Sequence, residues 1–153
     1  MRVVEVWLGE QRFGISVSSI DEVLPLVECR VLPGAPSWII GMARLRGAFT
    51  PLLDCGALLN NLPVERTMNA RIVLLQNGAA GGNIRLALLV DRVGAIVTAD
   101  PDAAGAHPGI ESIGRGSLGA ITMDSKGELC LIDLARIISD DDRALFRDAA
   151  QST

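Results

Sequence analysis

The order of apolar and polar residues predicts a chain built mainly from short strands. Apolar runs rich in β-branched residues alternate with polar or glycine-containing turns, which is typical of β-hairpins. A proline-rich connector at residues 32–36 and a glycine-rich linker at residues 77–83 interrupt the runs and disfavour helix. Outside the repeated unit described next, the predicted strands are residues 3–8, 13–17, 20–24, 71–76, 85–90 and 96–98.

A unit that runs from glycine to aspartate occurs twice in the chain. Residues 41–59 read as an apolar strand, a tight glycine turn, a second strand ending in Asp54, and a helical turn. Residues 119–138 repeat this plan, and their second strand ends in Asp133. Because the strands that precede each unit also correspond, the sequence indicates two similar halves.

The two aspartates at the strand ends are the first candidates for chemistry. Asp54 and Asp133 could form a carboxylate pair for acid–base work, but each stands directly before a helical turn. At that place an aspartate ordinarily accepts hydrogen bonds from the first backbone N–H groups of the helix. We therefore expect both residues to be helix caps.

The repeat defines the expected architecture. The halves are residues 1–62 and 69–138, and the polar stretch at 60–69 is the best internal boundary. Four or five short strands per half fit a pair of small antiparallel barrels better than one open sheet. The predicted fold class is all-β with minor α content.

A helix is predicted at the C-terminal end, over residues 139–150. Ser139 can cap it, and the acidic residues that follow complement the positive end of the helix dipole. We expect Ile138, Leu145 and Phe146 to seat this helix on the body of the protein.

Composition narrows the classes of partner and compartment. A length of 153 residues suits one domain, and 49% apolar with 21% charged residues argues against disorder. A net charge of -4 without a basic stripe argues against nucleic acid as a partner. The three cysteines form no Cys-x-x-Cys motif, so we expect reduced thiols that pack as small apolar groups. Without a signal peptide or an uncharged stretch of about eighteen residues, we expect a cytoplasmic protein with no direct membrane insertion.

Motifs for metals, cofactors and catalysis are missing from the sequence. The one histidine, His107, lies in a predicted Gly/Pro-rich loop at residues 100–116, and no second ligand group accompanies it. No nucleophile elbow, phosphate-binding loop or dinucleotide fingerprint is present. We therefore predict no metal, no cofactor and no enzymatic activity. A small enzyme is the alternative, and it would require a pocket with convergent titratable groups.

Arg46 is the most informative charged residue. It precedes Gly47 at the predicted tight turn, so its side chain should project from the hairpin tip. Arg44, two residues earlier on the same strand face, would make a paired guanidinium feature. Glu22, on the bent strand, could pair with either arginine. The alternatives are a solvated turn arginine and an exposed edge charge.

The order of these motifs resembles that of CheW-type chemotaxis coupling proteins. The resemblance covers about Val3 to Ile138. Its most specific part is the string Leu-Arg-Gly followed by Pro-Leu-Leu-Asp, in register with Val-Asp-Arg-Val of the second half. The matching segments are residues 8–17, 20–23, 32–36, 41–54, 89–93, 118–121, 131–133 and 137–138.

This resemblance implies a single CheW-like domain over residues 1–153, made of two intertwined five-stranded SH3-like barrels that can exchange strands, with a groove between them. Members of the family are non-catalytic adaptors. They couple the cytoplasmic tip of a methyl-accepting receptor to the regulatory domain of a CheA-type histidine kinase, and they form rings with it. The alternative is a CheW-like scaffold in another pathway, such as motility or surface sensing, with different partners.

The resemblance also implies which residues face partners. The binding roles fall on Arg46 and Glu22, while Ile20 and Val23 would flank the groove for the receptor. Two further positions, Val90 and Val93, would come from the other barrel. Arg44 departs from the asparagine that is usual in the family, and it could adapt the surface to a different receptor or kinase.

Overall fold

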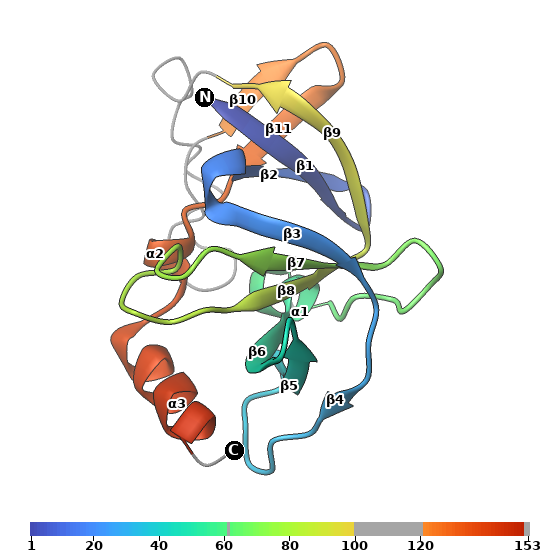
Figure 1. Ribbon diagram of the computed structural model, residues 1–153. Coiled ribbons are helices and arrows are strands. Elements are labelled where there is room, and N and C mark those ends of the chain that lie inside the picture. Colours follow the sequence, from blue (N-terminus) through green and yellow to red (C-terminus); the bar gives the residue numbers. More distant parts are fainter. Residues whose placement is uncertain (61, 100–120, 152–153) are drawn as a thin grey trace.

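Two β-sheets and three α-helices form the described part of the protein in this computed structural model, which covers residues 1–60, 62–99 and 121–151. One sheet lies above the other in the view of Figure 1, and the C-terminal helix lies beside the lower one. The mostly β architecture with two sheets predicted from the sequence is confirmed. The predicted loop at residues 100–116, which contains His107, lies outside the described residues.

The elements follow the predicted order. In chain order the strands are β1 (Arg2–Leu8), β2 (Gln11–Ser16), β3 (Ile20–Pro25), β4 (Cys29–Arg30), β5 (Ile39–Leu45), β6 (Ala48–Asp54), β7 (Arg71–Leu75), β8 (Ala87–Val90), β9 (Arg92–Thr98), β10 (Ile121–Asp124) and β11 (Gly127–Leu131). The helices are α1 (Cys55–Asn60), α2 (Leu134–Ile137) and α3 (Asp140–Gln151), with a 3-10 turn at Val17–Ser19.

The two halves exchange strands in space. Sheet A has the order β10-β11-β2-β1-β9, and sheet B has the order β3-β7-β8-β6-β5-β4. Each sheet therefore combines the first two strands of one half with the remaining strands of the other. The pairings correspond between the sheets: β1 pairs antiparallel with β9 as β7 does with β3, and β2 pairs with β11 as β8 does with β6.

The strand pairing differs in two details from the predicted pair of small antiparallel, five-stranded barrels. The pairings of β2 with β11 and of β6 with β8 are parallel. Each joins strands from different halves, so no tight turn imposes an antiparallel direction. Sheet B also has a sixth strand, because the two-residue β4 adds to the edge formed by β5.

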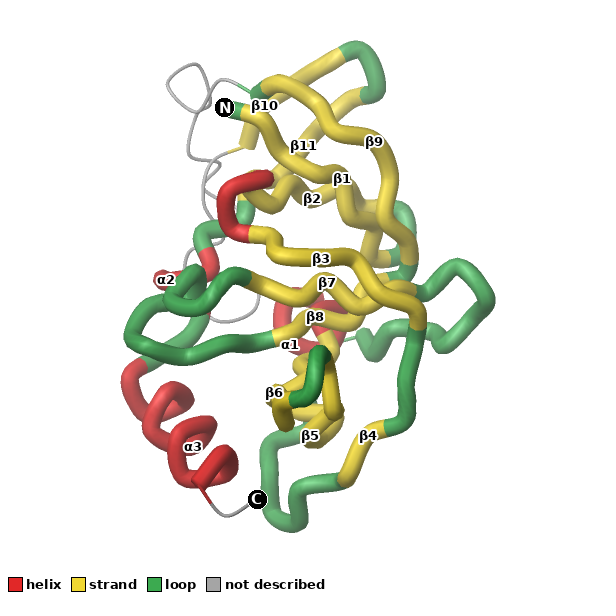
Figure 2. The backbone as a smooth tube through the Cα atoms, in the orientation of Figure 1, coloured by secondary structure: helices red, strands yellow, loops and turns green. Residues whose placement is uncertain are grey.

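A single segment joins the two edges of sheet B. Strand β3 pairs with β7 at one edge, and the chain then continues to β4, which pairs with β5 at the other edge. Figure 2 shows this path, running from the end of β3 down to β4 beside β5. Gly41 of β5 permits the approach, since a Cβ atom there would collide with the Arg30 carbonyl oxygen. The backbone of Gly41 also has a positive φ of 156°.

Both sheets share one hydrophobic core. Buried side chains of sheet A, such as Ile15 and Phe13, belong to the same cluster as Ile72 and Leu88 of sheet B and Leu58 of α1. This main cluster crosses from one sheet to the other, and a smaller second cluster, which includes Val3 and Leu129, is formed at sheet A. The strand exchange and the shared core make the two halves one packed unit.

Helix α3 begins with the predicted cap. The Ser139 hydroxyl accepts a hydrogen bond from the Asp142 N–H at 3.1 Å, and the Asp142 carboxylate accepts one from the Ser139 N–H at 2.9 Å. This reciprocal pair is a capping box. Phe146 is buried and meets the Trp38 ring edge-on, with ring centroids 6.1 Å apart. Leu145, the other residue of α3 predicted to pack against the body of the protein, is exposed. It lies on the solvent-facing side of the helix, next in the sequence to the buried Phe146.

The two repeated aspartates have different roles. The Asp54 carboxylate is buried and accepts hydrogen bonds from the Ala57 N–H at 2.9 Å and the Val64 N–H at 3.1 Å. It caps α1, as predicted, and also fixes the chain after that helix. Asp133 occupies the position before α2, but its exposed side chain makes no capping hydrogen bond. The predicted side-chain cap at Asp133 is therefore wrong.

Candidate functional site

The tip of the β5–β6 hairpin presents Arg46 to solvent. Arg46 has a φ of 51° and Gly47 a φ of 80°, and a two-residue hairpin turn of type I′ requires positive φ at both positions. Among the described non-glycine residues, Arg46 alone has a positive φ. Asparagine, aspartate or glycine would suit this conformation better, so the arginine is an unfavoured local choice for the turn. Such outliers are a reason to look for function.

Glu22 holds the Arg46 guanidinium in a two-pronged ion pair. The Arg46 Nε donates to Glu22 Oε2 at 2.6 Å, and a second guanidinium nitrogen donates to Oε1. A β-bulge between Ile20 and Glu22 sets the direction of the Glu22 side chain. The hydrogen bonds from Arg46 lower the pKa of Glu22, and those to Glu22 raise the pKa of Arg46. This ion pair thereby connects the tip of the β5–β6 hairpin to β3 at the protein surface.

Arg44 and Arg46 do not act as a guanidinium pair. The Arg44 guanidinium lies 5.6 Å from the centre of the Phe49 ring, on the neighbouring strand β6. Arg46 turns to Glu22 instead, because the left-handed turn conformation directs its side chain away from the regular strand. Of the two pairings considered for Glu22, the structure forms the one with Arg46.

An exposed apolar surface lies along the β3–β4 segment and the β5–β6 hairpin. We call it the β3–β4 surface, and its large exposed apolar residues are Val23, Leu26, Val27, Val31 and Phe49. A cleft of about 460 Å3 opens here, lined by Leu26, Val27, Val31, half-buried Cys29 and the exposed Arg66, among others. Exposed apolar residues next to charged ones are typical of binding surfaces. Sequence analysis did not identify this cleft, because its walls come from segments that are far apart in the sequence.

The other predicted groove residues are placed differently from one another. Ile20 is half-buried and Val23 is exposed, both on β3. Val93 is half-buried on β9 of sheet A. Val90 is fully buried in β8, in the same sheet as Ile20 and Val23. It therefore supports the site through packing, and the proposed contact from another barrel does not apply to Val90.

A second charged cluster, which sequence analysis also missed, lies in sheet A. Arg12 is buried and donates to Glu5 at 2.8 Å through Nε, and to Asp124 at 2.8 and 2.6 Å through its two terminal nitrogens. The Ala95 N–H at 3.0 Å and Lys126 at 3.4 Å complete the contacts of Glu5. The sequence separation of 112 residues between Arg12 and Asp124 leaves no local pattern that would reveal the cluster.

The pKa values in this cluster show that its charged forms are stabilised. Burial alone would raise the pKa of Glu5, but hydrogen bonds from the Ala95 N–H and Lys126, with the charge of Arg12, outweigh it and leave the pKa lowered. The hydrogen bonds from Arg12 lower the pKa of Asp124 to about 2. The cluster is therefore fully ionised near neutral pH.

The thiols have the properties of packed apolar groups. Burial raises the pKa of Cys55 to about 12, and the carboxylates of Asp54 and Asp91 add to the effect. None of the three cysteines is in a disulfide bond. Within residues 1–60, 62–99 and 121–151, no group of three or more His, Cys, Asp or Glu side chains is arranged to hold a metal ion. Over the same residues, no helix has the length and apolar character needed to cross a membrane.

Comparison with known proteins places these features in a family. A family model described as the CheW-like domain matches residues 2–142. The chain is 28% identical to a probable chemotaxis protein CheW of Rhizobium etli over 137 residues, which is 87% of this chain and 84% of that protein. It is 26% identical to the chemotaxis protein CheW of Rhizobium meliloti, over 89% of this chain and 86% of that protein.

A solved structure has the same fold. The scaffolding protein TtCheW from Thermoanaerobacter tengcongensis superimposes with a TM-score of 0.77, at 19% sequence identity. The superposition covers 92% of this chain and 89% of that protein. The two-sheet arrangement described above is therefore shared with a known scaffolding protein.

Proposed function

The chain belongs to the family of CheW-like domains, and on that premise we propose that it couples chemoreceptors to a histidine kinase of the CheA type. It is a scaffold of chemotaxis signalling, like the relatives named above. The receptor partner is the cytoplasmic tip of a methyl-accepting receptor, and the protein acts in the cytoplasm. The alternative, a scaffold in a different pathway, is less favoured because both relatives are named chemotaxis proteins.

The observation that carries the proposal is the β3–β4 surface, which involves the same elements, β3 and the β5–β6 hairpin, as the Glu22–Arg46 ion pair. Val23 and the cleft residues Leu26, Val27 and Val31 expose apolar side chains to water, and contact with a partner would bury this surface. An amphipathic helical tip can place its apolar face in such a groove. The ion pair supplies the charge that fixes the position of the tip.

Arg46 can serve this role because its ion pair lies at the surface. The side chain of Arg46 is 59% exposed and that of Glu22 is 33% exposed. Exposed ion pairs contribute little to stability, so a partner's carboxylate or carbonyl can take over the guanidinium without destabilising the fold. Arg44, held on Phe49, adds a second cation that would adapt the surface to a particular partner.

The kinase would use a different edge of the protein. Strand β9 ends sheet A on one side, and its Ile96 is 52% exposed. A contact at this edge leaves the β3–β4 surface free for the receptor, and repeated contacts of both kinds would generate rings. Individually weak contacts gain strength in such an array through effective concentration. The protein needs no catalysis for this role, and the charged groups that converge in sheet A are bonded to one another.

The test is a titration with two separate fragments, a receptor tip and a kinase regulatory domain. Arg46→Glu should weaken receptor-tip binding at least tenfold, roughly 1.4 kcal/mol, because it replaces an attractive contact with a repulsive one. Arg136→Glu is the matched control, since Arg136 is an exposed arginine on α2, away from the β3–β4 surface. Urea unfolding of each variant checks that the fold is retained.

A charge-swapped double variant separates two roles for Arg46. Glu22→Arg combined with Arg46→Glu restores the internal ion pair in reverse. If Arg46 contacts the receptor, the swap leaves binding weak. Full recovery of binding in the swap would show that Arg46 acts only through the internal ion pair and makes no contact of its own with the receptor. Wild-type binding of both fragments by Arg46→Glu alone would refute the assignment of this surface.

A further inference from the structure

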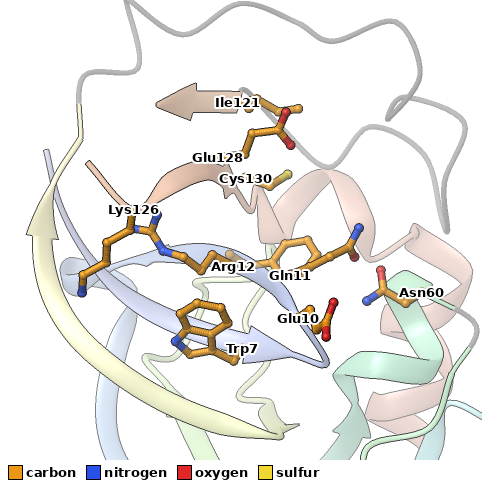
Figure 3. A pocket seen from close by; sticks show the side chains of 10 residues that line it. Trp7, Glu10, Gln11, Arg12, Asn60, Ile121, Lys126, Glu128 and Cys130 are labelled. Atoms are coloured by element: carbon orange, nitrogen blue, oxygen red, sulfur yellow. The ribbon is translucent and has the colours of Figure 1, made fainter. Parts of the chain in front are cut away.

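A pocket in sheet A lies apart from the surface proposed for the receptor. It has a volume of about 290 Å3 and sits beside the β1–β2 turn, between the start of β2, the end of α1 and the β10–β11 hairpin. Figure 3 shows Trp7 and Arg12 at its centre, Lys126 on one side, and Glu10 and Asn60 on the other. We call it the Trp7 pocket. Its volume is at the small end of ligand sites, which begin near about 300 Å3, and suits a side chain or a ligand of amino-acid size.

The two cations that line the Trp7 pocket are already engaged. Arg12 gives its guanidinium to Glu5 and Asp124, and Lys126 lies 3.4 Å from Glu5. Arg12 is therefore not free to attract an anion into the pocket, and the charge of Lys126 is partly offset by Glu5. Cys130, on the wall, contributes no charge either, because burial, with the nearby Glu128, raises its pKa to about 11.

Two carboxylates of the Trp7 pocket are without a partner. Glu10 and Glu128 line the pocket and are exposed, and neither makes a hydrogen bond or ion pair within the described part of the chain. The pocket and the cluster behind it hold four carboxylates, those of Glu5, Glu10, Asp124 and Glu128, against the cations of Arg12 and Lys126. Arg92, whose guanidinium lies 4.6 Å from the centre of the Trp7 ring, adds a third cation, so an excess of one negative charge remains. The pocket therefore favours a cation.

The aromatic wall of the pocket suits a guanidinium in particular. Arg92 already places its guanidinium over the Trp7 ring, 4.6 Å from the ring centre. Arg92 and Trp7 both line a neighbouring cleft, and Arg92 is not among the residues that line the Trp7 pocket. Tryptophan is the best aromatic partner for such cations. Trp7 thus already makes a cation–π contact with one guanidinium, and its ring also lines the pocket, where a second guanidinium can contact it.

We propose that the Trp7 pocket binds a guanidinium group carried on a short alkyl chain, as in an arginine side chain. The carboxylates of Glu10 and Glu128 would accept its charged hydrogen bonds, and the amide oxygens of Gln11 and Asn60 are available to accept others. Trp7 and Phe13 would pack against the alkyl chain. The site differs from the β3–β4 surface, so it offers the protein a second kind of recognition that is independent of Arg46.

The test uses N-acetyl-arginine amide as the probe and N-acetyl-citrulline amide as its neutral counterpart. The readout is the indole N–H resonance of Trp7 in a nitrogen–proton correlation spectrum of the full chain, with the Trp38 indole as an internal reference. We expect the arginine probe to shift the Trp7 resonance and leave that of Trp38 in place. Equal shifts with the citrulline probe, or no shift at saturating arginine probe, would overturn the proposal.

Variants test the two unpartnered carboxylates. Glu10→Gln combined with Glu128→Gln should weaken the arginine probe about tenfold, because two exposed charge contacts are lost. Glu28→Gln is the control, since this exposed carboxylate lies outside the pocket, and it should bind the probe like the wild type. Both carboxylates are exposed, so the double variant should fold. Unchanged affinity in the double variant would refute the role of the carboxylates.

A comparison of probes also identifies the source of the guanidinium. Free arginine carries a charged α-ammonium and a charged α-carboxylate, where an arginine within a protein has two neutral amide groups. If the site binds an arginine side chain on the surface of another protein, N-acetyl-arginine amide should bind more tightly than free arginine. Equal or tighter binding of free arginine would assign the pocket to the amino acid instead.

Discussion

The two hairpins that the sequence presents as copies differ in where their charges go. Hairpins β5–β6 and β10–β11 hold equivalent places in the two halves, and each pairs in parallel with a strand of the other half. The tip of the first directs Arg46 outward to Glu22, in an exposed pair. The second places Asp124 at its turn and gives its carboxylate to Arg12, beside the buried Glu5.

Under the function proposed above, one unit serves binding in one half and stability in the other. Opening an exposed pair costs little, because water replaces each lost contact. Removing one partner of a buried pair leaves an uncompensated charge in the interior, which is strongly unfavourable. The first hairpin is therefore suited to exchange partners, whereas the second fastens β10 and β11 to β1 and β2.

The largest expected effect comes from removing the buried cation. Arg12→Met leaves the Glu5 carboxylate buried with its main charged partner gone, and we expect a loss of about 3 kcal/mol of unfolding free energy. The measurement is urea unfolding followed by circular dichroism.

Lys126→Met is the matched control for Arg12→Met. Lys126 also contacts Glu5, but at 3.4 Å and with 55% of its side chain exposed, so its loss should cost less than about 1 kcal/mol. Equal losses for the two variants would contradict the distinction between buried and exposed partners.

A smaller effect is expected at the aspartate that ends the first hairpin unit. Asp54→Ala leaves the N–H groups of Ala57 and Val64 without their acceptor, and we expect a loss of about 2 kcal/mol in the same unfolding experiment. Asp133→Ala is the control from the second unit, where the exposed side chain makes no cap, so its effect should stay within about 0.5 kcal/mol. A larger loss of unfolding free energy for Asp133→Ala than for Asp54→Ala would contradict the difference between the two units.

The smallest effect is the pH dependence of the second hairpin. The folded-state pKa of Asp124 is about 2, below the ordinary 3.8, so its contribution to stability is present above pH 3.8 and is lost as the pH falls through about 2. We expect wild type to be more stable than Asp124→Asn near neutral pH, and the difference to shrink between pH 3.8 and about 2. A difference that is constant over this range would show that the charge of Asp124 contributes nothing.

Much of the fold and part of the site could be predicted from the sequence. The strand positions, the repeated hairpin unit, the Asp54 cap and the Ser139 cap depend on residues within a few positions of one another, where turn and capping preferences act. The two parallel pairings between the halves were not predicted, and the predicted side-chain cap at Asp133 was wrong, because the chain path beyond each local unit decides which partners are within reach. The partner-facing roles of Ile20, Val23 and Val93 stay predictions.

The sequence by itself determined the repeat, the family and the place of Arg46 at the hairpin tip. Only the tertiary structure decided which carboxylate pairs with Arg46. Glu22 lies 24 residues away in the sequence, and the bulge in β3 and the path of the chain from β3 to β4 bring the two side chains together. The same holds for Arg12 and Asp124, and for the burial of Val90. Contacts of this range follow from how the two halves exchange strands, and sequence periodicity carries no information about that exchange.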